Sequence, residues 1–140
     1  MTPEQIFSVV NLIALLSWAA LAALPGRRWV AKTVAGLAVP AVLTALYVAL
    51  IASSWGDPGS FSSLAGVALL FNNPWLLLAG WVHYLAFDLL VGAWEVTDAR
   101  DLGVPHFLVV PCLFLTFMFG PAGWLLYQGV RRAATTQPRP

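Results

Sequence analysis

The chain alternates long apolar stretches with short polar breaks. Four stretches, over residues 4–24, 33–54, 74–94 and 105–130, are mostly apolar, and each has the about 20 residues that a helix needs to cross a bilayer. A backbone surrounded by lipid must satisfy its own hydrogen bonds, so such stretches cross as helices. The pattern predicts an all-α membrane protein, a bundle of four transmembrane helices that forms a single transmembrane domain over residues 1–140.

The breaks carry the residues that end and begin helices. A proline-glycine pair at 25–26 ends the first stretch. Turn-forming residues fill 56–60, and Pro74 occupies a favourable first position of a helix. Residues 62–72 are apolar but too few to cross, so we expect a short interfacial or re-entrant helix there. The acidic segment 95–104 is expected to form the loop before the last span.

Composition supports this interpretation. The chain is 60% hydrophobic and only 9% charged, whereas soluble domains carry about 25% charged residues. Its apolar surplus must face membrane lipid. A net charge of +1, with basic residues in short clusters between apolar stretches, argues against a nucleic-acid partner. The lone Cys112 excludes an intramolecular disulfide and a cysteine-based metal cage.

Two ionisable groups lie inside the third predicted span. Such a group near the bilayer centre costs about 3 kcal/mol on insertion scales, so His83 and Asp88 are the most informative residues of the chain. They are five positions apart, or about 140° around a helix, and must face different neighbours. The spacing gives two faces: Trp81, Tyr84, Asp88 and Glu95 on one, and His83, Phe87, Leu90 and Trp94 on the other. We therefore expect protein, rather than lipid, around this helix.

Two interpretations of His83 and Asp88 follow. In the first they are structural and hold neighbouring helices together. In the second they are catalytic, because burial favours a neutral Asp88, His83 titrates near neutrality, and an acid with an imidazole can catalyse proton transfer. The second interpretation adds substrate-binding candidates on the same and neighbouring helices: Trp81, Tyr84, Phe87, Trp94, Asn11, Tyr47, Glu95 and His106.

His106 begins the fourth predicted span. Asp88 lies about 10 Å deeper than Glu95, at 1.5 Å per helical residue, so we expect His106 to lie at the membrane surface near Glu95. The chain has neither an HExxH nor a Glu-x-x-His pair, and we predict no metal and no cofactor. Residues 119–123, with two glycines and a proline, are expected to bend the fourth helix.

Orientation follows from the basic residues. Four spans place both termini on one side of the membrane. The loops on the opposite side hold four basic residues, and the side of the termini holds three: Arg27, Arg28, Lys32 and Arg100 against Arg131, Arg132 and Arg139. The early loop often sets orientation, so we expect both termini outside the cytoplasm.

The third span carries a family resemblance. Trp81, His83, Asp88 and the leucine after it match the W-x-H-x4-D-L signature of the abscisic-acid-deficient-four family, the neoxanthin-synthase-type proteins of plastids. The similarity continues from the short apolar segment at 63–71 to the glycine-proline segment at 119–123. Pro105 stands where the plastid proteins have an arginine. The chain resembles a bacterial member of this family, which implies a location in the bacterial inner membrane.

The resemblance implies a reaction. In plants the family is associated with the conversion of a 5,6-epoxy carotenoid to an allenic alcohol, a redox-neutral isomerisation. The reaction needs an acid at the epoxide oxygen and a base at a carbon-bound proton, which His83 and Asp88 would supply. The alternative is a non-enzymatic membrane subunit that binds a carotenoid or another isoprenoid lipid, or assists a membrane enzyme.

Overall fold

The computed structural model describes residues 1–54, 56 and 58–136, and this part of the chain contains helices and no strand. Asp57 of the expected turn and Arg139 of the tail lie outside the described residues. The helices follow in this order: α1 (Pro3–Ala23), the π-helix η1 (Val30–Ala38), which runs directly into α2 (Val39–Ser53), α3 (Leu64–Phe71), α4 (Pro74–Asp101), α5 (His106–Phe119) and α6 (Pro121–Thr136).

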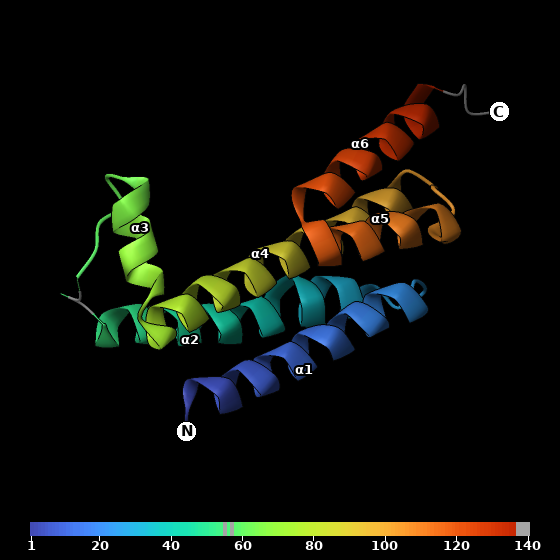
Figure 1. The fold of residues 1–140 in the computed structure, drawn as a ribbon. Helices are drawn as coiled ribbons and strands as arrows, with labels where there is room; N and C mark the ends of the chain where they lie inside the picture. The colour runs from blue at the N-terminus through green and yellow to red at the C-terminus, as the bar shows by residue number, and fades with distance from the viewer. Residues whose placement is uncertain (55, 57, 137–140) are drawn as a thin grey trace.

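Three helical segments in the described part of the chain are long and apolar enough to cross a membrane. They are α1, the continuous segment Val30–Ser53, and α4. The expected all-α architecture of membrane-crossing helices is confirmed to this extent. The short helix expected at 62–72 is present as α3. The side chains of Leu64, its first residue, and of Phe61, just before it, are each 86% exposed. Figure 1 shows α3 standing away from the other helices at one end of the molecule.

Local sequence explains where the helices begin. Thr2 and Gln5 form a capping box at the start of α1, because the Thr2 side chain accepts from the Gln5 N–H and the Gln5 side chain accepts from the Thr2 N–H. At the start of α4, the Asn73 side chain accepts from the backbone N–H of Trp75 at 2.8 Å. Each cap satisfies a donor that a helix end otherwise leaves unpaired.

The proline in the second crossing segment coincides with a change of helix type. Pro40 has no N–H to donate, and its ring would crowd the carbonyl of the residue four positions earlier. The turns directly before it are π-helical, with the N–H of Val39 bonded to the carbonyl of Val34. This wider spacing relieves the crowding, and the segment continues without a break to Ser53.

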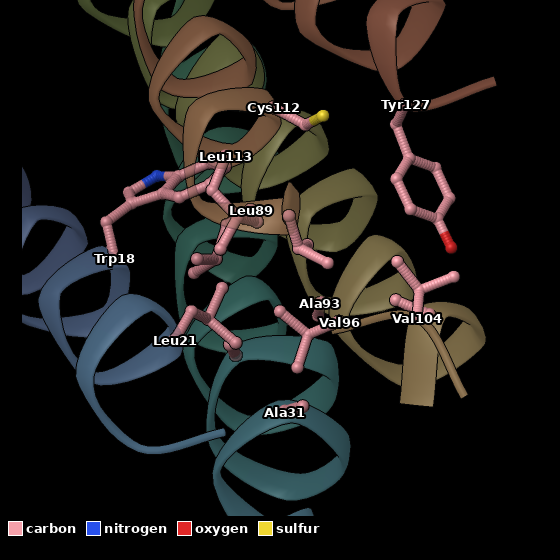
Figure 2. Close-up of a cluster of buried hydrophobic side chains, with 13 residues drawn as sticks. Trp18, Leu21, Ala31, Leu89, Ala93, Val96, Val104, Cys112, Leu113 and Tyr127 are labelled. Atoms are coloured by element: carbon pink, nitrogen blue, oxygen red, sulfur yellow. The ribbon is translucent and has the colours of Figure 1, made fainter. Parts of the chain in front are cut away.

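The centre of the molecule is α4, which packs against every other helix. Its buried residues fall into two clusters. One, with α1 and α2, lies along the first half of α4 and includes Val82 and Leu85. The other lies along the second half, where Figure 2 shows Trp18 and Leu21 of α1 on one side of Leu89 and Tyr127 of α6 on the other.

The prediction of a single helix over 105–130 is wrong. Two helices, α5 and α6, meet instead at Gly120, which has a φ of +44° that a glycine adopts readily. The residue that follows is Pro121, at the start of α6. With its 14 residues, α5 is about 21 Å long at 1.5 Å per residue, shorter than the about 30 Å hydrocarbon core.

The chain reverses direction at this break. Thr116 of α5 contacts Glu95 of α4, and Tyr127 of α6 contacts Asp98, further along α4. The two short helices thus form a helical hairpin, residues 106–136, in which α6 returns toward the end from which α5 came (Figure 1). The sequence indicated a bend at 119–123 but not this reversal.

The loop expected at 95–104 is also wrong. Helix α4 continues to Asp101, and Gly103 follows its C-terminal cap Leu102 with a φ of +73°. No proline or glycine lies between 95 and 101 to stop the helix. Glu95 therefore lies within α4 and is fully buried, rather than in an exposed loop.

Candidate functional site

His83 lies at the wall of a cavity between α2, α3 and α4. Its ring centroid is 5.4 Å from that of Tyr47 on α2 and 4.7 Å from that of Phe87 on α4. The cavity has a volume of about 590 Å³, within the about 300–1,000 Å³ range of small-molecule sites. Besides His83 and Tyr47 its wall is mostly apolar, with Ile51, Phe61, Leu70, Phe71 and Leu76 among the lining residues. His83 is exposed and Tyr47 is half-buried, so the cavity is an open, mostly apolar groove with an imidazole and a phenol in its wall.

Asp88 lies on another side of α4, against the helical hairpin. A Cβ added at Gly120 would lie 2.9 Å from its Oδ1, so the break between α5 and α6 sits next to this carboxyl group. Tyr84, one turn earlier, donates its hydroxyl to the carbonyl of Phe117 at 3.0 Å. The expectation that His83 and Asp88 face different neighbours agrees with this geometry. The structure does not bring the two residues together in one cavity.

Glu95 faces the hairpin two turns beyond Asp88. Its Oε1 accepts from the Thr116 hydroxyl at 2.9 Å. Tyr84, Asp88 and Glu95 thus form the polar face that their spacing predicts. Trp81 departs from that face, because its indole N–H donates to the Asn11 side chain of α1 at 3.1 Å.

Trp81 and Asn11 connect α4 to α1. The Trp81 ring also packs against Phe7, with centroids 5.5 Å apart, and against Tyr84 at 5.4 Å. A second cavity of about 360 Å³ lies beside them between the starts of α1 and α4. Its lining contains no imidazole, and its one ionisable side chain is Glu4 at the helix start. This cavity therefore has fewer side chains that could act as an acid or a base than the cavity that contains His83.

His106 does not meet an acidic side chain. Its Nε2 lies 2.9 Å from the carbonyl oxygen of Ala22 at the end of α1. The expectation that His106 lies near Glu95 is wrong, because the longer α4 places Glu95 inside the bundle, whereas His106 contacts the end of α1. No three His, Cys, Asp or Glu side chains come together as a metal site within residues 1–54, 56 and 58–136.

The end of the hairpin is fixed to α4 by Asp98. Its Oδ2 accepts from the Tyr127 hydroxyl at 2.6 Å and from the Arg131 Nε at 2.9 Å. The hydrogen bond to Asp98 raises the pKa of Arg131. Tyr127 is fully buried and its ring meets Trp94 edge to face. The sequence pattern does not mark Thr116 or Tyr127 as site residues, although Thr116 is an isolated polar group within an apolar stretch.

We expect Tyr127→Phe to destabilise the protein. The change removes a buried donor to a carboxylate, and such hydrogen bonds contribute about 1.5–3 kcal/mol. Arg28→Gln is the control, because the ion pair of Arg28 with Asp101 is exposed and 3.5 Å long, and exposed pairs contribute about 0–1 kcal/mol. Thermal unfolding in one detergent compares the two. Equal melting temperatures for both variants would contradict the role given to Asp98.

Comparison with known proteins agrees with the motif in α4. No curated protein and no solved structure matches the chain. A family model described as ABA DEFICIENT 4-like matches residues 5–127. The matched range contains His83, Asp88, Glu95 and the Gly120 break, and it covers most of the chain. The protein is therefore a member of the ABA DEFICIENT 4-like family.

Proposed function

We propose that the protein binds an isoprenoid, such as a carotenoid, in the cavity between α2, α3 and α4 and isomerises it by proton transfer at His83. The observation that carries the proposal is the imidazole in the wall of an apolar cavity of about 590 Å³. An isoprenoid dissolves in the membrane and can enter such a cavity from the lipid. Family membership and the apolar helices support a membrane protein, which we place in the bacterial inner membrane.

The chemistry follows from the groups in the cavity. In the conversion of an epoxide to an allenic alcohol, the base takes a proton from carbon, the C–O bond breaks and the oxygen takes a proton from an acid. Electrons and atoms balance without an oxidant. His83 is suited to be the base, since an imidazole nitrogen can accept a proton from carbon. The proton then returns from His83 to the acid.

Two side chains are candidates for the acid. Tyr47 shares the cavity with His83, and their rings are 5.4 Å apart. Asp88 is the stronger acid but faces the hairpin, on another side of α4. A general acid must come within hydrogen-bonding reach of the oxygen that it protonates. The geometry favours Tyr47 for a substrate held in the cavity of His83.

The test is pigment conversion in a host that produces 5,6-epoxy carotenoids. We expect the wild type to convert the epoxide, and His83→Gln and Tyr47→Phe to lower conversion by at least the about 100-fold typical of a lost acid or base. Thr44→Val, an exposed change on α2 one turn before Tyr47, is the matched control and should convert normally. Protein yield and melting temperature show that each variant folds.

Other outcomes would redirect the proposal. Full conversion by a folded His83→Gln variant would contradict it, and loss of conversion in Asp88→Asn alone would move the chemistry to the hairpin side of α4. The alternative function is a non-enzymatic subunit that holds the isoprenoid for a partner enzyme. This function would use the same apolar cavity. The wild type would then purify with unchanged pigment, and Gly80→Leu, which fills the space beside Phe71, would purify without it.

A further inference from the structure

The interface between α4 and the helical hairpin contains a buried acid with an incomplete set of partners. Glu95 has no exposed surface. The Thr116 hydroxyl donates to its Oε1, whereas its Oε2 has no hydrogen-bond partner in the described part of the chain. A buried carboxylate normally accepts several hydrogen bonds or pairs with a cation. One neutral donor is too little for an ionised carboxylate at this place.

Asp88 lies two turns earlier on the same face of α4 and is half-buried. Its Oδ2 is buried and also has no hydrogen-bond partner among the described residues. The two residues are seven positions apart, which places them on one face with about 10.5 Å of helix rise between them. The chain reversal at Gly120 lies against Asp88. Irregular backbone at membrane depth occurs where protein or a water-filled space covers it.

Among the described residues, the ion pairs of the acidic side chains involve Asp98 and Asp101, and no cation pairs with Asp88 or Glu95. From the hairpin, the titratable groups that interact with Glu95 are the Cys112 thiol and the Tyr127 hydroxyl, and from α4 itself Asp88. Tyr84 is the titratable neighbour of Asp88. The buried residues that α1 and η1 contribute to this cluster are uncharged: Trp18, Leu21, Ala31 and Ala35. Arg131, the basic residue of the hairpin nearest to Asp98, is held there by two nitrogen contacts.

We propose that Asp88 and Glu95 form a proton-binding site inside the membrane, in which both carboxyl groups are neutral. Leaving a charge buried without a partner costs several kcal/mol, and a bound proton removes that cost. The proton also makes the unpartnered oxygen a donor, which can use the second lone pair of a helical carbonyl. The ligand of this site is a proton. The site lies on another side of α4 from His83, and it does not depend on the proposed isomerase activity.

Infrared difference spectroscopy of the full-length protein in lipid nanodiscs at neutral pH tests the site. A neutral carboxylic acid has a C=O stretching band that is absent from a carboxylate and shifts in D₂O. We expect the wild type to show this band, and Asp88→Asn and Glu95→Gln each to remove one component. Asp101→Asn is the matched control, because Asp101 is exposed and paired with Arg28, and it should leave the band unchanged.

A further variant covers the case in which Glu95→Gln does not accumulate. Thr116→Val removes the hydroxyl that donates to Glu95 but keeps its shape, so it should shift the Glu95 component without removing it. Absence of a neutral-acid band from the wild type at neutral pH would overturn the proposal. A band that persists unchanged in Asp88→Asn and in Thr116→Val would overturn it as well.

Discussion

Replacing Gly123 by alanine is expected to force α6 away from α5 and to destabilise the protein more than any other single methyl group at a glycine. An added Cβ would overlap the backbone nitrogen and the Oγ1 of Thr116. Backbone cannot rotate out of the way as a flexible side chain can, so the two helices must separate. Overpacking of this kind costs about 1–3 kcal/mol, and displacing Thr116 also weakens its hydrogen bond to Glu95.

Gly129→Ala is the control for this change. Gly129 lies on the same helix, but an added Cβ would meet no atom within 4 Å. Alanine favours a helix over glycine by up to about 1 kcal/mol, so this variant should be as stable as the wild type or slightly more stable. Melting temperatures in a single detergent decide the matter. Equal melting temperatures for Gly123→Ala and Gly129→Ala would contradict the close packing of α6 against α5 at Thr116.

The length of apolar stretches was sufficient to predict most of the fold. Bilayer thickness sets a minimum helix length, and α1, Val30–Ser53 and α4 meet it. Residues such as Pro74 and the pair at 25–26 marked helix boundaries because their effects are local. Helix α4 is longer than its sequence predicts, because the acidic residues in 95–101 favour a loop but none of them stops a helix.

The hairpin could not be predicted in the same way. A stretch of apolar residues has the same hydropathy whether it continues across the bilayer or turns back. Gly120 and Pro121 signal a break, but the direction after the break depends on contacts with α4 that are distant in sequence. Thr116 with Glu95 and Tyr127 with Asp98 make those contacts.

The candidate site was predictable in its residues but not in its grouping. Helical periodicity placed His83 and Asp88 on different faces and joined Asp88 to Tyr84 and Glu95. It could not identify the helix that covers each face. In the structure, the face of α4 that contains His83 lies toward α2 and α3, and the face that contains Asp88 lies against the hairpin. The assignment of Asp88 and His83 as a catalytic pair therefore remains a prediction, which the geometry does not favour.

The second large effect concerns membrane topology. If α5 and α6 form a hairpin that enters the membrane and returns, the chain crosses three times and its termini lie on opposite sides. Six of the seven Lys and Arg residues of the chain then lie at one end, that of Ala22 and His106: Arg27, Arg28, Lys32, Arg100, Arg131 and Arg132. Basic residues favour the cytoplasmic side. We therefore expect Thr2 outside the cytoplasm and Thr136 inside, in place of both termini outside.

Cysteine labelling in intact cells measures this topology directly. In a Cys112→Ala background, single cysteines at Thr2, Arg28 and Thr136 report three positions to a maleimide that cannot cross the membrane. If α5 and α6 form a hairpin, we expect Thr2→Cys to react in intact cells, and Arg28→Cys and Thr136→Cys to react only after the cells are opened. Equal reaction of Thr2→Cys and Thr136→Cys in intact cells, with Arg28→Cys protected, would mean that residues 105–130 cross the membrane and would contradict the account.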